Sequence, residues 1–324
     1  MKKIGIIGGS GYTGGELIRL IIDHPEIELD FVYSSTKQNK LITDTHLDLL
    51  GRTNLSFTNK INSSVDILFL CLGHGKSKAF LDRHKFSDST CIIDLSNDFR
   101  LNNENSFDDL NFVYGLPEFQ KDKISKAKYI ANPGCFATVI QLSLLPLAKN
   151  NLIERPIHTS ATTGSTGAGA GLSDTKHFSW RNNNLSWYKP FIHQHLEEIN
   201  QTLRSLIKNK LEIIFLPFRG NFTRGIFSTS YTYYKGSLET AVELYKDYYK
   251  NDPFTHISKK EISLKNVINS NNCFIHLHKH DNILLITSAI DNLIKGAAGQ
   301  AIQNLNIMMN WSEALGLRLK SNIY

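Results

Sequence analysis

A short apolar strand, a glycine-rich turn and a helix begin this chain, and they constrain its fold more than any other feature. Residues 3–7 form an apolar run that is typical of a buried strand, and residues 16–22 place leucine and isoleucine on one helix face. Between them lies the sequence GGSGYTGG, and a second strand is predicted at 29–33. Strand, glycine-rich turn, helix and strand at this spacing are typical of a dinucleotide-binding βαβ unit.

The glycines of this turn have a physical role if a cofactor binds there. Gly8, Gly11 and Gly14 would let backbone N–H groups approach a pyrophosphate at the positive end of the helix, where side chains would hold it away. The alternative is a plain strand–helix turn without a ligand. The residues between these glycines that we also expect to contact the cofactor are Ser10, Tyr12 and Thr13.

The segment after the second strand indicates which cofactor is bound. NAD sites usually carry an acidic residue about twenty residues beyond the glycines, where it bonds the ribose 2′-hydroxyl. Here residues 33–40 contain no acid, but they contain Ser34, Ser35, Lys37 and Lys40. Hydroxyl groups and lysines suit a 2′-phosphate, so the sequence predicts NADP.

Two further apolar runs continue the strand–helix alternation. Residues 65–72 and 90–95 are apolar almost throughout, as expected for parallel strands that are covered on both faces. Ligands of such sheets bind beyond the carboxyl ends of the strands, which places Arg100 near a site. The sequence therefore predicts an α/β protein with a Rossmann-type parallel-sheet nucleotide domain.

Cys135 is the strongest candidate for a nucleophile. It follows Pro133 and Gly134 and opens an apolar helix predicted to run to about residue 145. N–H groups and the dipole at a helix N-terminus favour thiolate over thiol. The other three cysteines lie in strands or in a polar loop without a helix start, and they are expected to be unreactive: Cys71, Cys91 and Cys273.

A thiolate needs a base, and two histidines about sixty residues later could serve. His193 and His195 precede a helix with Leu196, Ile199 and Leu203 on one face. Cysteine–histidine pairs are commonly distant in sequence and joined by the fold. The alternative is that both histidines only cap or solvate the helix.

Composition excludes several classes of protein. The net charge of +6 and the pI near 9.0 suit anionic small molecules, and no block of lysine and arginine indicates nucleic-acid binding. No apolar run reaches the roughly 18 residues of a membrane span, and the first apolar stretch is too short for a signal peptide. The four cysteines form no CxxC pair, so neither disulfides nor a metal site is expected. We expect a cytoplasmic protein that binds neither nucleic acid nor membrane.

Nine motifs in order resemble those of the N-acetyl-γ-glutamyl-phosphate reductases of arginine biosynthesis. The resemblance extends from residue 4 to the last helix, and the ordered set is more specific than any single member. The motifs are GGSGYTGGEL, LGHGKS, DLSNDFRL, YGLPE, NPGCFAT, GSTGAGAG, HQHLEEI, RGNFTRGI and IDNLIKGAAGQAIQN.

The resemblance implies a reaction. The thiolate of Cys135 attacks N-acetyl-L-glutamyl 5-phosphate, phosphate leaves, and NADPH reduces the thioester to N-acetyl-L-glutamate 5-semialdehyde. His195, with His193 as the alternative, activates the thiol and moves the proton. A thiol suits this chemistry because a thioester accepts hydride better than a carboxylate does.

The resemblance also implies roles for binding residues. Arg100 resembles the phosphate-binding arginine of related semialdehyde dehydrogenases, since a planar guanidinium can hold an oxyanion through two bonds. Arg219 and Arg224 are candidates for the α-carboxylate of the substrate. Gln300, on a helix predicted to start near Lys295, is expected to reach the cofactor.

Some positions depart from the pattern of the family. Phe136 and Ala137 replace Tyr-Pro after the cysteine, Gln194 and Leu196 replace Arg and Thr around the second histidine, and Ala170 replaces a basic residue. The acyl group is therefore open, and an N-succinyl-glutamyl or aminoadipyl phosphate is an alternative substrate. Aspartate-semialdehyde dehydrogenase is the rival enzyme, and an NADP-binding sensor is the rival that is not an enzyme.

The predicted organisation has two domains. Residues 1–134 and 290–324 are expected to form the NADP-binding domain, and residues 135–289 an α+β substrate and dimerisation domain with an antiparallel sheet. An asparagine-rich stretch at 182–184 is expected to be a surface loop. Exposed sheet commonly supports assembly, so we expect a homodimer or homotetramer.

Overall fold

A computed structural model describes residues 1–208 and 210–322 of the chain. Residues 209, 323 and 324, which the predicted domain ranges include, lie outside the described part. The chain divides into two compact units. Unit 1 comprises Met1–Pro133 and Ala297–Arg318, and unit 2 comprises Gly134–Gly296 with the residues from 319 onward. Each unit is described below by itself.

Unit 1 is built on a six-stranded sheet in the order β2-β1-β3-β4-β8-β7, in which all neighbours are parallel. The apolar runs of the sequence become its central strands; all four residues of β3 are buried. This confirms the predicted Rossmann-type sheet. The strands are β1 (Lys2–Ile7), β2 (Ile27–Tyr33), β3 (Ile67–Leu70), β4 (Cys91–Asp94), β7 (Val113–Tyr114) and β8 (Tyr129–Ala131), with a separate hairpin of β5 (Ser106–Phe107) and β6 (Leu110–Asn111).

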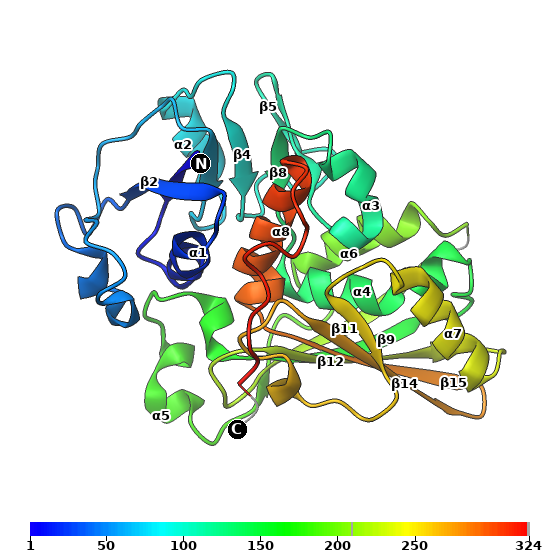
Figure 1. Cartoon of the computed structure of the whole chain (residues 1–324). Coiled ribbons are helices and arrows are strands. Elements are labelled where there is room, and N and C mark those ends of the chain that lie inside the picture. Colours follow the sequence, from blue (N-terminus) through cyan, green and yellow to red (C-terminus); the bar gives the residue numbers. More distant parts are fainter. Residues whose placement is uncertain (209, 323–324) are drawn as a thin grey trace. The chain divides into compact units, whose positions relative to one another are not determined.

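The helices of unit 1 include one from the far end of the sequence. Helix α8 packs against α1 and α3, so the chain returns to unit 1 after completing unit 2 (Figure 1). The predicted helix start near Lys295 is confirmed, because a π-helical turn (Ile294–Ala298) continues directly into α8. The helices are α1 (Tyr12–Ile22), α2 (Ser77–Arg83), α3 (Pro117–Ile124) and α8 (Gly299–Met308), with 3₁₀ turns at Ile42–Asp44 and Leu47–Leu49.

Unit 2 contains a seven-stranded sheet in the order β10-β11-β9-β12-β15-β14-β13. The prediction of an antiparallel sheet is wrong in part: β11 is parallel to β9, and β13 is parallel to β14. Helices α5 (Phe178–Arg181) and α6 (His195–Arg204) lie between β9 and β11 in the sequence, whereas the connection from β13 to β14 contains a 3₁₀ turn (Leu264–Asn266). The strands are β9 (Ile157–Thr163), β10 (Ser186–Trp187), β11 (Ile213–Arg219), β12 (Ile226–Tyr233), β13 (Thr255–Ser258), β14 (Cys273–His280) and β15 (Ile283–Ile290).

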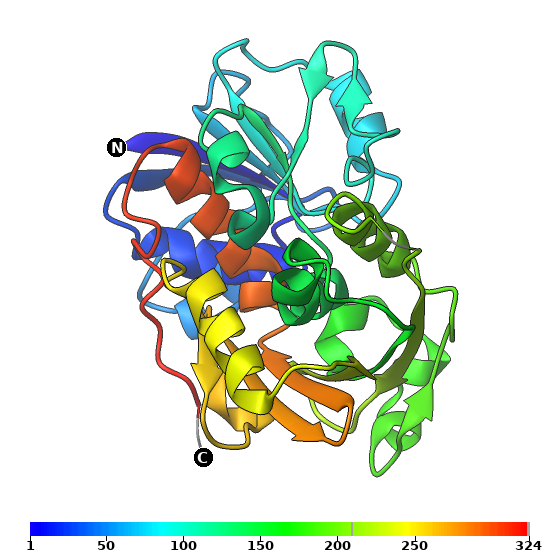
Figure 2. The same ribbon diagram turned by 90° about the vertical axis from the view of Figure 1, so that its right-hand side faces the viewer.

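Three helices of unit 2 pack against this sheet. Helix α4 contacts β12, β14 and β15, α6 contacts β11, and α7 contacts β13 and β14 (Figure 2). Burial alternates along β9 and most of β12, so one face of each strand is buried and the other is half-buried or exposed. The helices are α4 (Cys135–Lys149), α5 (Phe178–Arg181), α6 (His195–Arg204) and α7 (Leu238–Tyr249), with 3₁₀ turns at Ser165–Ala168, Asp174–Lys176 and Leu264–Asn266.

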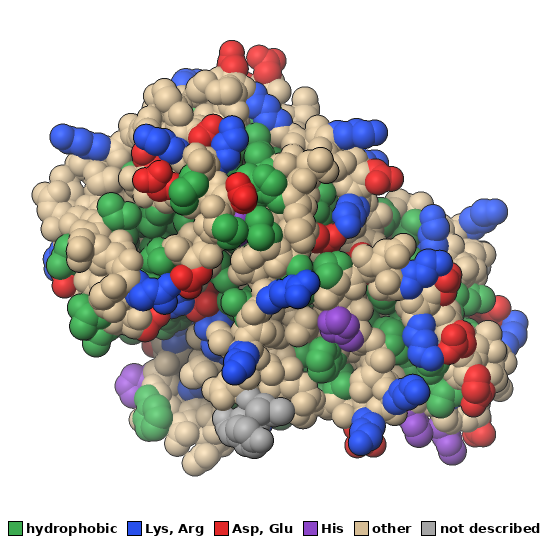
Figure 3. Space-filling view, in the orientation of Figure 1, with side chains coloured by type: hydrophobic (Ala, Val, Ile, Leu, Met, Phe, Trp, Pro, Cys, Tyr) green, Lys and Arg blue, Asp and Glu red, His purple; other side chains and the backbone are tan. Residues whose placement is uncertain are grey.

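The surface carries charges of both signs. On the face drawn in Figure 3, lysine and arginine side chains lie among aspartate and glutamate, as on an ordinary solvated surface. Within residues 1–208 and 210–322, no helix combines the length and the apolar character that a membrane crossing needs. The same residues place no group of three or more His, Cys, Asp or Glu side chains where it could hold a metal ion.

Candidate active site

Two glycines of the turn before α1 are required by the fold of unit 1. Gly8 has a φ of +86°, and a Cβ there would lie 2.6 Å from the carbonyl oxygen of Cys71. A Cβ on Gly14 would lie 2.6 Å from the Cα of Gly9. Gly8 therefore lets the turn lie against the backbone that follows β3, and Gly14 lets α1 lie against the turn, whether or not a ligand binds.

Gly11 is different, because the protein leaves space beside it. The nearest atom to a Cβ at this position would be the carbonyl oxygen of Gly8, at 3.7 Å. Gly11 is the N-cap of α1, where no side chain caps the helix and the first turn contains no acid. A pyrophosphate could therefore approach this helix end without displacing a group of the protein. The neighbouring Tyr12 is 44% exposed.

The segment after β2 contains the residues predicted to distinguish the cofactors. Ser34 is buried, and its Oγ lies 3.1 Å from the Oγ of Ser10 in the glycine turn. The fold thus brings two predicted cofactor residues together from positions 24 residues apart. Ser35 is exposed and Lys37 is half-buried, and no acid occurs between residues 34 and 40.

Two carboxylates occupy the start of α2. Asp98 accepts hydrogen bonds from the backbone N–H groups of Gly75, Ser77 and Lys78 at 2.6, 2.9 and 3.2 Å. Asp94 accepts the hydroxyls of Ser77 and Ser96, each at 2.6 Å. Burial raises the pKa of Asp94 to about 6, against the opposing effect of these hydrogen bonds. The N–H groups at the start of α2 are therefore bonded to a carboxylate of the protein.

Arg100 is buried beside this cluster. Its Nε donates to the carbonyl oxygen of Asn132 at 2.8 Å, and an Nη donates to that of Leu95 at 3.0 Å. Asn132 in turn accepts from Asn304 of α8 at 3.0 Å. These bonds connect the carboxyl end of the sheet to the returning helix, on which Gln300 is also buried. Substrate binding by Arg100 and cofactor contact by Gln300 stay predictions.

Cys135 is the first residue of α4 in unit 2, and its side chain is partly exposed. Gly134 is the N-cap and no side chain caps the helix, so the positive helix end lies beside the sulfur. Burial raises the pKa of the Cys71 and Cys91 thiols instead, and Cys273 is fully buried in β14. Of the four cysteines, Cys135 alone is both partly exposed to solvent and located at the start of a helix.

His195 packs directly over the residue that precedes the thiol. A Cβ on Gly134 would lie 2.4 Å from the Nε2 of His195, so only glycine fits beneath the imidazole. Glu198, one turn along α6, accepts the N–H of Gly134 at 3.0 Å and lies 3.9 Å from the same Nε2. The backbone N–H of His195 donates to the Nδ1 of His193 at 3.2 Å. The fold therefore brings both predicted histidines to the start of α4.

A tyrosine and an arginine extend this cluster. The ring of Tyr188 lies 5.6 Å from that of His193, and the guanidinium of Arg219 lies over the Tyr188 ring at 3.9 Å. Burial, followed by the negative charge of Cys135, raises the pKa of Tyr188. Arg219 thus shares a cluster with Cys135.

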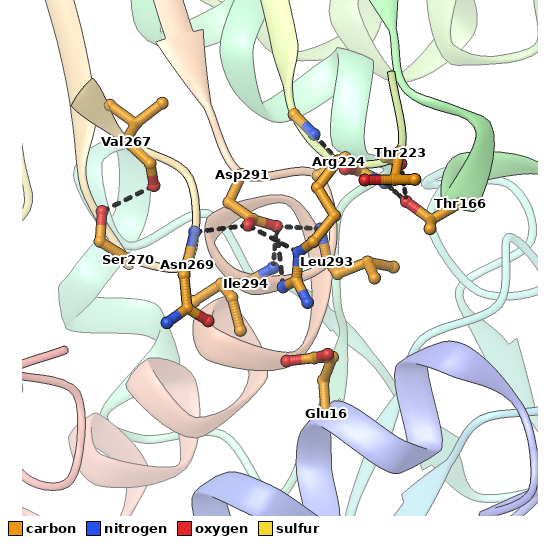
Figure 4. A network of polar contacts seen from close by, with 12 residues as sticks. Glu16, Thr166, Thr223, Arg224, Val267, Asn269, Ser270, Asp291, Leu293 and Ile294 are labelled. Carbon is orange, nitrogen blue, oxygen red and sulfur yellow. Dashed lines mark hydrogen bonds and ion pairs between the residues drawn. The ribbon is translucent and has the colours of Figure 1, made fainter. Parts of the chain in front are cut away.

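Arg224 has a different environment, centred on the fully buried Asp291 (Figure 4). Its Nε and an Nη donate to the two carboxylate oxygens at 3.0 and 3.2 Å. The carboxylate also accepts the backbone N–H groups of Asn269, Leu293 and Ile294 at 2.7, 2.8 and 3.1 Å. Asp291 therefore connects Arg224 to the start of the π-helical turn.

That turn places backbone against Cys135. Gly296 donates its N–H to the carbonyl oxygen of Asp291 at 2.9 Å, and a Cβ on Gly296 would lie 2.8 Å from the Cβ of Cys135. Only a residue without a side chain therefore fits beside Cys135 at this position.

Glu198 and Tyr188 were not singled out from the sequence. Glu198 follows His195 by three residues, so helical spacing places it on the same face and offered a usable signal. Tyr188 offered none, because only the pairing of β10 with β11 brings it beside Arg219.

Comparisons with known proteins found family models and relatives that match most of the chain. Residues 3–127 match the family model described as "Semialdehyde dehydrogenase, NAD binding domain", and residues 135–292 match "Semialdehyde dehydrogenase, dimerisation domain". A protein of Flavobacterium johnsoniae named N-acetyl-gamma-glutamyl-phosphate reductase is 55% identical over 99% of both chains. A protein of the same name from Christiangramia forsetii is 52% identical over the full length of both chains.

Solved structures share the fold. Aspartate semialdehyde dehydrogenase II from Vibrio cholerae superposes with a TM-score of 0.72 over 96% of this chain and 99% of that one. The two sequences are only 14% identical, so the likeness extends to the fold alone.

Proposed function

Because the chain belongs to the family of N-acetyl-γ-glutamyl-phosphate reductases, we propose that it reduces N-acetyl-L-glutamyl 5-phosphate to N-acetyl-L-glutamate 5-semialdehyde and phosphate. One observation carries the mechanism: Cys135 opens α4 with the imidazole of His195 packed over Gly134. A thiol at a helix start beside an imidazole is the arrangement that nucleophilic catalysis needs.

Cys135 forms the covalent intermediate. His195 removes the proton of the thiol, the sulfur attacks the acyl carbon, and the bond from that carbon to the phosphate oxygen breaks. Phosphate leaves and a thioester remains on Cys135. NADPH, when bound, supplies the hydride that reduces this thioester. The resulting hemithioacetal oxyanion collapses to the aldehyde, expels the thiolate, and His195 returns the proton to it.

We assign the proton transfer to His195 and a supporting role to His193. His195 contacts the backbone at Gly134, whereas His193 contacts His195 through its Nδ1 and packs against Tyr188. Glu198 lies 3.9 Å from the His195 ring and can stabilise its protonated form.

The residues at the start of α1 fit NADP. The open space at Gly11 and the uncapped helix end suit a pyrophosphate. Ser34, Ser35 and Lys37 suit the 2′-phosphate, and the segment lacks the acid that would favour NAD. We therefore propose that Gly8, Gly11, Gly14 and the residues between them hold the cofactor.

A substrate panel tests the proposal in the reverse direction. The protein is given phosphate, NADP or NAD, and one of three aldehydes: N-acetyl-glutamate semialdehyde, N-succinyl-glutamate semialdehyde or aspartate semialdehyde. We expect phosphate-dependent reduction of NADP, with an N-acyl-glutamate semialdehyde preferred. A preference for aspartate semialdehyde would overturn the assignment, and turnover without phosphate would contradict the acyl-phosphate chemistry.

We propose further that the chain acts as a homodimer or homotetramer through the sheet of unit 2. Helices α4, α6 and α7 pack against the sheet, while its half-buried and exposed positions include His158 and Tyr231, whose rings stack at 4.9 Å. Sedimentation equilibrium tests this, and a monomer at micromolar concentration would contradict it. We also propose a cytoplasmic location, because a catalytic thiol needs a reducing compartment.

A further inference from the structure

Two arginines of unit 2, Arg181 and Arg219, lie near each other and near Tyr188. Arg219, the last residue of β11, stacks on the Tyr188 ring at 3.9 Å. Arg181, the last residue of α5, donates from an Nη to the carbonyl oxygen of Thr163 at 3.2 Å. Thr163 is the residue paired with Arg219 across β9 and β11, so this bond brings the Arg181 guanidinium beside Arg219.

Neither guanidinium has a counter-ion within the described part of the chain (1–208 and 210–322). No carboxylate lies within ion-pair distance of Arg181 or Arg219, whereas Arg224, five residues further along, is paired with Asp291. The Nε of Arg181 is buried and has no hydrogen-bond acceptor. Burial first, and then the charge of Arg219, lower the pKa of Arg181. Two adjacent cations with an unused buried donor are unfavourable unless an anion neutralises them.

The cluster is continuous with the catalytic residues. The ring of Tyr188 lies 5.6 Å from that of His193, whose ring lies 4.7 Å from that of His195 above Gly134. The charge of Cys135 is also one of the influences on Tyr188. An anion at the two arginines can therefore belong to the molecule that Cys135 attacks.

We propose that Arg181 and Arg219 form a carboxylate-binding subsite for the end of the substrate remote from the acyl phosphate. The inference rests on the proposed function and extends it to a specificity residue, Arg181. Planar guanidinium groups bind a carboxylate through paired hydrogen bonds, and Tyr188 fixes one of them by stacking.

The reacting phosphate is a poorer fit to this position. Its phosphorus is two bonds from the carbon that the Cys135 sulfur attacks, so it must lie beside that sulfur. The rings of His193 and Tyr188 come between the start of α4 and Arg219 in the chain of contacts. A carboxylate at the other end of a glutamyl skeleton, or at the end of a dicarboxylic N-acyl group, is several bonds away from the acyl carbon and can lie beyond these rings.

Four aldehydes distinguish the two sources of the carboxylate. They are N-acetyl-glutamate semialdehyde, its α-carboxamide, N-succinyl-glutamate semialdehyde, and the derivative whose succinyl carboxylate is an amide. Wild type, Arg181→Gln, Arg219→Gln and Arg181→Lys are assayed with phosphate and NADP. Arg204→Gln, which changes an exposed arginine at the end of α6, is the matched control.

We expect each glutamine variant to raise the KM for the carboxylate-bearing aldehyde about 10- to 100-fold with little change in kcat, because charge-assisted hydrogen bonds are lost. The KM for phosphate should stay within about twofold. Arg181→Lys should recover part of the loss. Loss of the effect with the α-carboxamide assigns the subsite to the α-carboxylate, and loss with the succinyl amide assigns it to the acyl tail.

Three outcomes would overturn the proposal: equal penalties on all four aldehydes, a rise in the KM for phosphate instead, or no penalty at all. A binding measurement separates this proposal from the proposed function. In the Cys135→Ser background, N-acetyl-glutamate and N-succinyl-glutamate are titrated by calorimetry with and without Arg219→Gln. Weaker binding in the double variant supports the subsite even if no aldehyde is turned over, and unchanged binding of both ligands rejects it.

Discussion

The starts of α2 and α4 show two uses of the same local structure. Each helix follows a strand of the parallel sheet in the sequence and presents unpaired N–H groups at its first turn. At α2 these groups are bonded to the carboxylate of Asp98, with Asp94 and its two serine partners next to it. At α4 no side chain caps the helix, and Cys135 occupies its first position.

The difference shows how a helix end occupied by a carboxylate of the protein differs from one where no side chain caps the helix. Where a carboxylate of the protein accepts the N–H groups at a helix N-terminus, this favourable interaction stabilises the folded protein. The same N–H groups are then not available to a ligand. Where the end is uncapped, it stays available to stabilise a thiolate or to bind an anion. Removing a group should therefore reduce activity at α4 and reduce stability at α2.

The largest expected effect is at α4. Cys135→Ser should lower kcat for phosphate-dependent NADP reduction by at least about 10³-fold, because serine is a poor nucleophile here and its ester a poor hydride acceptor. Steady-state assays of purified protein measure this, with Cys91→Ser as the matched control. Turnover by Cys135→Ser within tenfold of wild type would refute a catalytic role for this helix start.

The next effect separates the two histidines beside α4. His195→Gln should lower kcat by about 10²- to 10⁴-fold and remove the acidic limb of the pH–rate profile, as loss of a general base does. His193→Gln should have a smaller effect and retain that limb, since His193 acts through His195. If the two variants exchange these phenotypes, the assignment of the base must be reversed.

At α2 the first test is the pH dependence of stability. The pKa of Asp94 is about 6 in the folded protein against an ordinary 3.8, so the folded state binds the extra proton between about pH 4 and pH 6. The free energy of unfolding contributed by this group should fall as pH rises through that range, by at most about 3 kcal/mol, and then level off.

Asp94→Asn should abolish this contribution. Urea unfolding of both proteins at pH 4, 5, 6 and 7 measures the difference between them, which cancels the carboxylates that titrate alike in each. A stability difference that is constant from pH 4 to pH 7 would show that Asp94 does not titrate there.

The smallest expected effect is at the capping carboxylate of α2. Asp98→Ala should reduce the free energy of unfolding by about 1–2 kcal/mol, because three backbone N–H groups lose their acceptor. The exposed Asp88→Ala is the control and should change stability by less than about 0.5 kcal/mol. If the two variants have equal free energies of unfolding, the carboxylate of Asp98 does not stabilise the start of α2.

Much of this protein follows from local patterns. The apolar runs, the glycine turn and the start of α4 are each encoded within about fifteen residues, and the Rossmann-type sheet that they predict is confirmed. The strand pairings of unit 2 were predicted less well. Which strand lies beside which depends on long-range packing, so the parallel pairs β9–β11 and β13–β14 could not be recognised from alternation alone.

The environments of the arginines likewise could not be predicted from local sequence patterns. Arg219 and Arg224 lie in one motif and were given one expected role, yet Arg224 is paired with Asp291 and Arg219 stacks on Tyr188. Arg181 precedes an asparagine-rich stretch predicted to be a surface loop and had no expected role. Its position beside Arg219 depends on a bond to Thr163, 18 residues away.

The sequence by itself determined the chemistry available to this protein: a thiol at a helix start, two histidines before a helix, and a glycine turn without a following acid. These are local features, because a helix end and a strand–turn–helix unit need only neighbouring residues. The tertiary structure decided which charged groups form ion pairs, as Arg224 does with Asp291, and which pack on an aromatic ring instead, as Arg219 does on Tyr188. That depends on the burial of partners far apart in the chain, and burial exists only once the units have folded.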